Sequence, residues 1–412
     1  FGVNVEASSV DFGRAMDYVA ERIAKVGEHD SPEAMGAKGV EVAFGGAEFV
    51  DRNHLRVGDR VVESKATIIA VGSKAKAPEI TGLETAGYID HVSLFRLRTL
   101  PKRLVVIGGG PIGLEMGQAL ARFGSRVTIL ESGPRLLKRD DEGLSDLLRQ
   151  HLSEEMTIHS EAKVVEISTR HGSKVVTYER EGVREEVECD EILVAVGRAP
   201  ALKGLGLEKA GVEWNDRGII VDSTLATTAK GVWACGDCTG GFQFTHWAEA
   251  QARVAARNAL FRGAKKMSDS PVPWTTFTDP ELAHVGLTEK QANASGASVE
   301  VYRFPYERLD RAVTDGETRG LAKVICDRNG KILGASILGH SAGEAITEVV
   351  LAMDNGIALS KLTQSIHVYP TMNRVIRRLG DERFLNHGVS QWTTKLFGRF
   401  RQECATDPRE MG

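Results

Sequence analysis

Arg103-Leu-Val-Val-Ile-Gly-Gly-Gly-Pro-Ile-Gly-Leu-Glu-Met-Gly117 is the stretch of this sequence that decides the fold. Its apolar start predicts a buried strand that runs directly into Gly108-x-Gly110-x-x-Gly113 and then into a helix. In such a turn the first glycine permits the tight bend, the second lets a pyrophosphate approach the backbone, and the third lets helix and strand pack closely. The helix N-terminus then faces the phosphates. The residues expected against a dinucleotide are Gly108, Gly110, Pro111, Ile112 and Gly113.

A second predicted strand, Arg126–Leu130, follows the helix and ends at Glu131. An acid at this position of a dinucleotide fold accepts hydrogen bonds from the adenosine ribose hydroxyls, which favours NADH over NADPH. Arg135 and Lys138 follow closely enough in sequence to bind a 2′-phosphate, so NADPH stays an alternative. We expect Glu131 to be a cofactor-binding residue.

The composition limits the class of protein. The 412 residues are 42% hydrophobic and 26% charged, which is typical of globular domains, and the length suggests about two to four of them. The net charge of −4 argues against a nucleic-acid partner, and no apolar run approaches the ~20 residues of a membrane span. The five cysteines are too scattered for a disulfide framework, and the first residues show no secretory pattern. We expect a cytoplasmic protein.

Hydrophobic periodicity predicts alternating strands and helices along most of the chain. Helices are expected at 10–25, 244–262 and 342–355. Strands are expected at 40–44, 55–62, 67–71 and 191–196, with a hairpin at 163–168 and 174–179. This alternation indicates an α/β protein.

Several motifs resemble, in their order, those of the pyridine nucleotide-disulfide oxidoreductases, the flavoproteins that include dihydrolipoamide dehydrogenase, glutathione reductase and mercuric reductase. The similarity covers most of residues 40–385. The motifs that carry it are Ile68-Ile-Ala-Val-Gly-Ser73, Gly108–Gly117, Ala195-Val-Gly-Arg198, Val232-Trp-Ala-Cys-Gly-Asp237, Phe277-Thr-Asp-Pro-Glu281 with Val285-Gly-Leu-Thr-Glu289, and Ile366-His-Val-Tyr-Pro-Thr371.

The resemblance implies an α/β fold with two Rossmann-like domains and a C-terminal α+β interface domain. The FAD domain would be split between 1–99 and 197–268, with its N-terminal portion missing. The NAD(P) domain would occupy 100–196, the interface domain 269–385 and a polar tail 386–412. The implied cofactors are FAD and NAD, and the implied assembly is a homodimer.

The same resemblance assigns the flavin site. In the family the carboxylate at Asp237 binds the ribityl chain, and the following helix points its N-terminus at the flavin ring. Phe244, Thr245 and His246 would line the flavin edge, although a helix-start histidine such as His246 is as often a capping residue. The other expected FAD contacts are Ala47, Gly72, Ser73, Gly197, Arg198 and Gly236.

Two cysteines of the flavin motif have the spacing of a redox or metal pair. Cys235 and Cys238 lie inside the FAD motif, and no second pair accompanies them, so we expect neither a redox role nor a metal site.

The C-terminal motif departs from its relatives. Dihydrolipoamide and glutathione reductases carry His-Pro followed by Glu as a proton-shuttling pair, whereas this sequence has Tyr369-Pro370 and Arg374. A phenol, with an ordinary pKa of about 10, is a poor general base at neutral pH. Mercuric reductases are more similar here, because they place Tyr near the active site. His367 is an alternative base, or a packing residue of the interface.

Glu115 is a third catalytic candidate. In the family the matching Glu pairs with a Lys beside the redox cysteines; a solvated helix face is the alternative. The sequence lacks the first GxGxxG turn and the Cys-x-x-x-x-Cys pair with which family members open. Val3–Lys25 resembles the segment that follows the redox helix, so we expect a portion of a longer protein.

Three functions remain open from the sequence. The first is an FAD-dependent reductase that passes hydride from NAD(P)H through flavin to a disulfide, a metal ion or another small acceptor. The second is a dithiol-free NADH:quinone or oxygen reductase. The third is a non-catalytic nucleotide-sensing protein.

Overall fold

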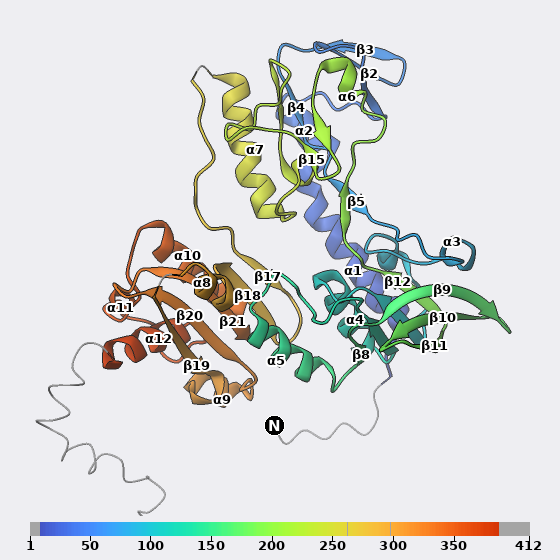
Figure 1. Cartoon of the computed structure of the whole chain (residues 1–412). Helices are drawn as coiled ribbons and strands as arrows, with labels where there is room; N and C mark the ends of the chain where they lie inside the picture. Colours follow the sequence, from blue (N-terminus) through green and yellow to red (C-terminus); the bar gives the residue numbers. More distant parts are fainter. Residues whose placement is uncertain (1–8, 262, 297, 387–412) are drawn as a thin grey trace, which may run out of the picture. The chain divides into compact units, whose positions relative to one another are not determined.

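The computed structural model describes residues 9–261, 263–296 and 298–386 (Figure 1). Contacts within the chain define two compact units. Unit 1 comprises Phe1–Leu136 and Leu152–Asp269, and unit 2 comprises Leu137–His151 and Ser270–Gly412. No helix in the described ranges is long and apolar enough to cross a lipid bilayer.

A four-stranded parallel sheet carries the predicted dinucleotide turn in unit 1. Its strands run in the order β12 (Glu191–Val194), β6 (Arg103–Ile107), β7 (Arg126–Leu130) and β8 (Thr157–His159). From Leu104 to Ile107, β6 is buried at every residue, as expected for a strand covered on both faces. Helix α4 (Pro111–Arg122) connects β6 to β7. The predicted strand, turn, helix and second strand are confirmed.

The remaining sheets of unit 1 are small. The predicted hairpin is confirmed as β9 (Lys163–Arg170) and β10 (Ser173–Arg180), to which β11 (Val183–Cys189) adds a third antiparallel strand. β4 (Thr67–Ile69) pairs in parallel with β16 (Val232–Ala234), and β5 (Ser73–Ala75) pairs antiparallel with β13 (Arg198–Pro200). The other elements of this part are α2 (Pro32–Ala37), α3 (Leu83–Ala86), α6 (Leu207–Ala210), β14 (Trp214–Asn215), β15 (Gly218–Ile219) and α7 (Thr245–Leu260).

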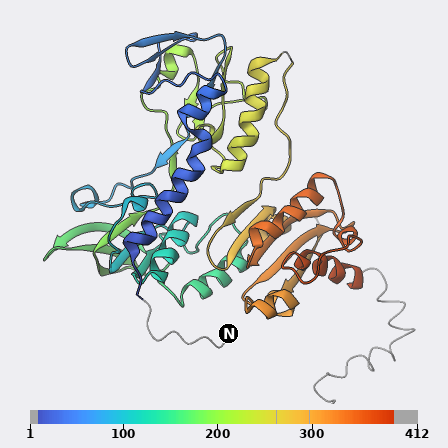
Figure 2. The same ribbon diagram turned by 180° about the vertical axis from the view of Figure 1, so that it is seen from behind.

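The first described helix, α1 (Phe12–Gly27), is the long blue helix of Figure 2 and matches the expected segment. The Asp11 carboxylate caps it and accepts from the Arg14 amide at 2.9 Å. The strand predicted at 40–44 is wrong: Val40, Val42 and Phe44 are exposed, and the chain there has no strand partner among the described residues. An alternating pattern does not make a strand without a surface to cover.

The strand predicted at 55–62 is instead a hairpin. It divides into β2 (His54–Val57) and β3 (Arg60–Glu63) at Gly58, whose φ of 59° makes the turn, and β1 (Ala47–Phe49) pairs with β2.

Unit 2 is built on a five-stranded antiparallel sheet. The strand order is β17 (Trp274–Thr276), β18 (Glu281–Gly286), β21 (Ile332–Gly339), β20 (Leu321–Asp327) and β19 (Val299–Pro305). The smaller elements are α5 (Glu142–Leu152), α8 (Glu289–Ala294), α9 (Asp310–Asp315) and α11 (Leu359–Leu362).

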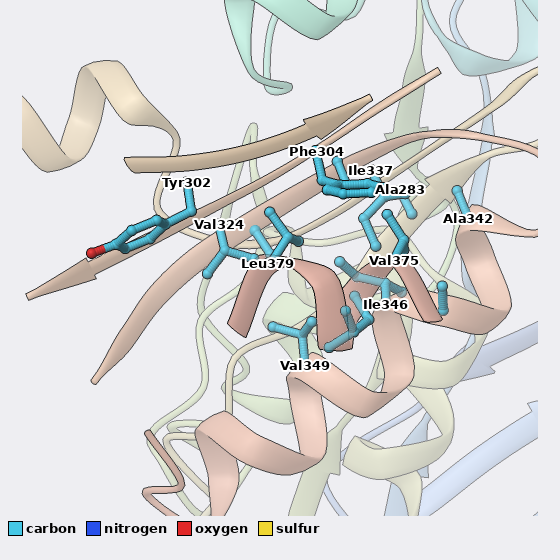
Figure 3. Close-up of a cluster of buried hydrophobic side chains, with 14 of the residues drawn as sticks. Ala283, Tyr302, Phe304, Val324, Ile337, Ala342, Ile346, Val349, Val375 and Leu379 are labelled. Atoms are coloured by element: carbon cyan, nitrogen blue, oxygen red, sulfur yellow. The ribbon is translucent and has the colours of Figure 1, made fainter. Parts of the chain in front are cut away.

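The core of unit 2 lies between this sheet and two helices, α10 (Ala342–Asp354) and α12 (Arg374–Phe384). Buried α10 residues recur every three or four positions, which gives one apolar face. Figure 3 shows side chains from strands and helices pointing toward one another. Among them are Ala283, Phe304, Val324, Ile337, Ile346, Val349, Val375 and Leu379.

Residues 137–151 belong to unit 2 through polar contacts. The Asp140 carboxylate accepts from Trp274 Nε1 at 2.9 Å, and Lys323 Nζ lies 2.7 Å from Asp141 Oδ1. At the surface, Lys290 Nζ lies 2.8 Å from Glu142 Oε1. These bonds attach α5 and the turn before it to the C-terminal sheet.

Candidate functional site

The turn after β6 has the geometry that a dinucleotide requires. A Cβ on Gly113 would lie 2.1 Å from the Gly108 carbonyl oxygen, so only glycine lets α4 start this close to the strand. By contrast, a Cβ on Gly110 would have nothing within 4 Å. Pro111 occupies the first turn of α4, where its missing N–H is not needed. The space beside Gly110 is therefore open to a ligand, whereas the space beside Gly113 is occupied by the protein's own backbone.

Glu131 lies where the sequence places it, directly after β7. Its carboxylate accepts hydrogen bonds from the Gly109 amide at 2.8 Å and the Gly133 amide at 2.6 Å, and the residue is 7% exposed. The acid thus ties the glycine turn to the end of the second strand. The contact of Glu131 with a nucleotide ribose stays a prediction.

Three of the expected flavin residues form one polar cluster. Ser73 Oγ donates to Asp237 Oδ2 at 2.6 Å, and Arg198 Nε donates to Ser73 Oγ at 2.7 Å. Arg198 Nη2 lies 3.3 Å from the same carboxylate oxygen. The three residues come from β5, β13 and the 3₁₀ helix at Gly236–Thr239. This cluster therefore joins the antiparallel β5–β13 pair to the segment that follows β16.

The two cysteines of the flavin motif are enclosed. Cys235 is 3% exposed and Cys238 is fully buried, and burial raises the pKa of both thiols. Cys238 Sγ donates to the carbonyl oxygens of Cys235 at 3.1 Å and Ile69 at 3.4 Å. A buried, protonated thiol is a poor nucleophile and metal ligand, which argues against a redox role here.

Aromatic side chains gather at the start of α7. The Phe244 ring stacks on Phe242 with centroids 5.8 Å apart and on His246 at 5.5 Å. Thr245 and His246 are exposed at the first turn of the helix. This end of α7 presents aromatic side chains beside the helix N-terminus. Gly236 contacts α7 further along, where its amide donates to Oε1 of the buried Gln251 at 2.7 Å.

The third set of candidates lies in unit 2. The Arg374 guanidinium carbon is 4.7 Å from the centroid of the Tyr369 ring, within the range of a cation–π contact. Tyr369 is 61% exposed. The exposed phenol thus lies within cation–π distance of a half-buried guanidinium at the start of α12.

His367 is held in a different environment from Tyr369. Its side chain is 6% exposed, and its Nε2 lies 2.9 Å from Glu348 Oε1 of α10. Its Nδ1 lies 3.1 Å from the Ser365 carbonyl oxygen, and Asn373 Nδ2 donates to the second oxygen of Glu348 at 2.5 Å. Both ring nitrogens are engaged, so His367 anchors the segment that presents Tyr369.

The comparisons with known proteins identify the family. Residues 8–252 match the family described as pyridine nucleotide-disulphide oxidoreductase, and residues 272–379 match its dimerisation domain. The chain belongs to this family. Its fold is that of the flavoprotein disulfide reductases, and the family assignment makes it an FAD-dependent enzyme that uses a pyridine nucleotide.

Individual relatives of this oxidoreductase differ in the names they carry. A mercuric reductase of Bacillus cereus is 33% identical over 90% of this chain, which spans only 59% of that protein. A dihydrolipoyl dehydrogenase of Thermus scotoductus is 38% identical, over 81% of this chain and 73% of that one. Among solved structures, a Cu(II) complex of the HOCl-induced flavoprotein disulfide reductase RclA from Escherichia coli has a TM-score of 0.83 at 34% identity, covering 90% of this chain and 85% of that chain.

The described residues of the oxidoreductase fit the two cofactors. Gly110 leaves the space that a pyrophosphate needs, and Gly72, with a φ of 67°, likewise has nothing within 4 Å of a built Cβ. Gly197, which precedes Arg198, is equally open. The Asp237 carboxylate is 13% exposed and oriented by Ser73 and Arg198, as a group that binds flavin hydroxyls must be.

Other predicted residues lie apart from these clusters. Ala47 pairs with Val57 in the β1–β2–β3 sheet, whereas Ser73 belongs to the β5–β13 sheet and Gly72 directly precedes it. Glu115 and Ile112 are half-buried on the first turns of α4. Their assigned contacts stay predictions. The sequence reasoning missed Glu348 and Asn373, because nothing local connects them to His367.

A matched pair of glycine variants tests the turn. We expect Gly113→Ala to lower the rate of flavin reduction by NADH at least about tenfold and to destabilise the protein by about 1–3 kcal/mol, because its methyl group overlaps the Gly108 carbonyl. Gly110→Ala should change the unfolding midpoint little and raise the apparent Kd for NADH. Stopped-flow reduction and urea unfolding measure both. An unchanged Kd in Gly110→Ala would show that the nucleotide does not lie against this residue.

Proposed function

We propose that this oxidoreductase takes electrons from NADH through FAD and delivers them to a small acceptor near Tyr369, as a disulfide or metal-ion reductase similar to mercuric reductase. When bound, FAD supplies the hydride acceptor and the electron relay. The cation–π pair of Tyr369 and Arg374 is the observation that carries the proposal, since these residues replace the His and Glu that lipoamide and glutathione reductases use.

Different residues of the chain are assigned to the nucleotide, the flavin and the acceptor. The glycine turn and Glu131 hold the nucleotide, while Asp237, oriented by Arg198, holds the flavin side chain. Tyr369 is exposed and able to contact an acceptor, whereas His367 is enclosed by Glu348 and Ser365. We therefore assign Tyr369 to the acceptor and His367 to positioning of its segment. As in the family, two copies would form a dimer through the matched dimerisation domain.

A dithiol-free quinone or oxygen reductase is the second candidate. The same substitution favours it, because quinones and oxygen do not require the His–Glu proton shuttle. Family membership favours either enzyme over a nucleotide sensor.

We also propose a cytoplasmic location for this protein. It is supported by the buried free thiols Cys189, Cys235, Cys238 and Cys326, which are typical of a reducing compartment.

One experiment separates the two enzymatic candidates. Anaerobic NADH is added to the full-length, FAD-loaded protein, and solvent-accessible thiols are titrated before and after reduction. A disulfide or metal-ion reductase should gain about two thiols per subunit. A dithiol-free enzyme should gain none while its flavin is still reduced, and absence of flavin reduction would overturn both.

Preference for NADH is a separate prediction. Repulsion between Glu131 and a 2′-phosphate should cost at least about 1 kcal/mol, so NADH should reduce the flavin roughly fivefold faster than NADPH at equal low concentration. Stopped-flow reduction with both nucleotides measures the ratio, and Glu131→Gln should narrow it. Faster reduction by NADPH would show instead that Arg135 or Lys138 binds the phosphate.

A further inference from the structure

A shallow surface pocket lies beside Tyr369 in unit 2. It is open to solvent and encloses no cavity, so a ligand bound there would lie at the surface against the side chains that line it. Three arginines line the pocket, namely Arg311, Arg374 and Arg378, against the single acid Asp310. The remaining lining comes from Leu309, Tyr369, Pro370 and Thr371.

The three arginines of this pocket differ in whether a carboxylate lies near them to neutralise their charge. Arg311 Nε lies 2.6 Å from Asp315 Oδ2, and Arg378 Nη1 lies 3.8 Å from Asp381 Oδ2. Arg374 differs, because its Nε is buried and has no hydrogen-bond partner among the described residues. A buried guanidinium nitrogen without a partner costs free energy, and an anion in the pocket would recover part of it.

The contact with Tyr369 leaves Arg374 able to bind such a ligand. The guanidinium carbon lies over the Tyr369 ring, 4.7 Å from the ring centroid, and a cation–π contact of this kind uses none of the guanidinium N–H donors. A planar donor array matches the two oxygens of a carboxylate or phosphoryl group. Arg378 follows four residues later on the same face of α12, so its charge adds to that of Arg374.

We infer that Arg374, with Arg311 and Arg378, forms an anion subsite beside Tyr369 that selects acceptors bearing a carboxylate or phosphoryl group. The inference deepens the proposed function and depends on it only for the acceptor's identity. Where relatives place Glu, this chain places Arg, so the charge next to the acceptor is reversed. The reaction with a disulfide balances as NADH plus H⁺ plus the disulfide giving NAD⁺ and two thiols.

Binding is tested without turnover. Malonate and, separately, inorganic phosphate are titrated calorimetrically into the full-length, FAD-loaded protein saturated with NAD⁺, which fills the dinucleotide turn. We expect a Kd at or below about 1 mM for at least one of them, weakened about tenfold or more by Arg374→Gln and less by Arg374→Lys. The two titrations distinguish a carboxylate from a phosphoryl ligand. Arg308→Gln is the matched control, because Arg308 stacks on Phe304 and does not line the pocket.

Selectivity is tested with three disulfides of different charge. Dithiodiglycolate is a dianion, bis(2-hydroxyethyl) disulfide is neutral and cystamine is a dication. The dianion should have the lowest KM, and Arg374→Gln should raise that KM about tenfold while changing the neutral one less than about twofold.

Three results would overturn the subsite. The first is that the unaltered protein binds no anion, and the second is that Arg374→Gln binds the anion equally well. The third is that Arg374→Gln no longer forms a dimer on gel filtration, which would mean that the arginine pairs with a carboxylate of a second copy. If malonate binds as expected but no acceptor is turned over, the subsite stands and the proposed function fails.

Discussion

Replacing Lys323 by alanine is expected to destabilise unit 2 by about 3–5 kcal/mol, the cost of leaving a buried charge without its partner. Lys323 lies on β20 with its side chain 6% exposed, and its Nζ lies 2.7 Å from both Asp141 Oδ1 and Glu289 Oε2. The Asp141 side chain is only 2% exposed. Burial raises the pKa of Glu289, but Lys323 and Arg303 outweigh it and hold that pKa below its ordinary value.

Two further variants make this prediction specific. Lys290→Ala removes a surface pair between α8 and Glu142 of α5, in which the Lys290 side chain is 74% exposed, and should cost no more than about 1 kcal/mol. Combining Lys323→Met with Asp141→Leu removes both charges of the buried pair and should recover much of the loss. The urea midpoint, followed by tryptophan fluorescence, compares the variants. If Lys323→Ala and Lys290→Ala were equally stable, the buried pair would not hold 137–151 on the sheet.

Local patterns predicted the parts of this fold that depend on neighbours in sequence. The turn at Gly108–Gly113 was predictable because strand, glycines and helix are contiguous, and the close approach of Gly113 to the Gly108 carbonyl is contained within the motif. The strand predicted at 40–44 failed because alternation cannot report whether a partner strand exists, and Phe44 is 81% exposed. At 55–62 the sequence contains a turn signal, Gly58-Asp59, which the prediction of a single strand did not use.

The site was predictable as a set of residues but not as a geometry. Asp237, Ser73 and Arg198 were each expected near FAD, yet their hydrogen bonds join positions 164 and 125 residues apart, and no local pattern encodes them. The same limit hid Glu348, which determines that His367 is enclosed. The position of Arg378 beside Arg374 could have been predicted from the sequence, because residues four apart lie on the same face of a helix.

The second large effect is expected from Tyr369 and Arg374, which replace the His and Glu of the proton shuttle. Turnover of lipoamide and oxidised glutathione should be about 100- to 10,000-fold slower than flavin reduction by NADH. That factor is the rate enhancement that general acid–base groups usually contribute. Tyr369→His alone should recover little, because the new imidazole would lie against the Arg374 cation, which disfavours its protonated form. Adding Arg374→Glu supplies the carboxylate that favours that form.

Steady-state turnover of both disulfides, measured beside stopped-flow flavin reduction, gives the gap for each variant. Tyr369→His with Arg374→Glu should recover part of the disulfide turnover in a full-length protein that gains thiols on reduction. Tyr369→Phe with Arg374→Glu is the matched control, because it supplies the carboxylate but no base and should stay slow. Disulfide turnover as fast as flavin reduction in the unaltered protein, and lost in His367→Gln, would contradict the prediction. It would mean that His367 leaves Glu348 during catalysis and supplies the proton that Tyr369 does not.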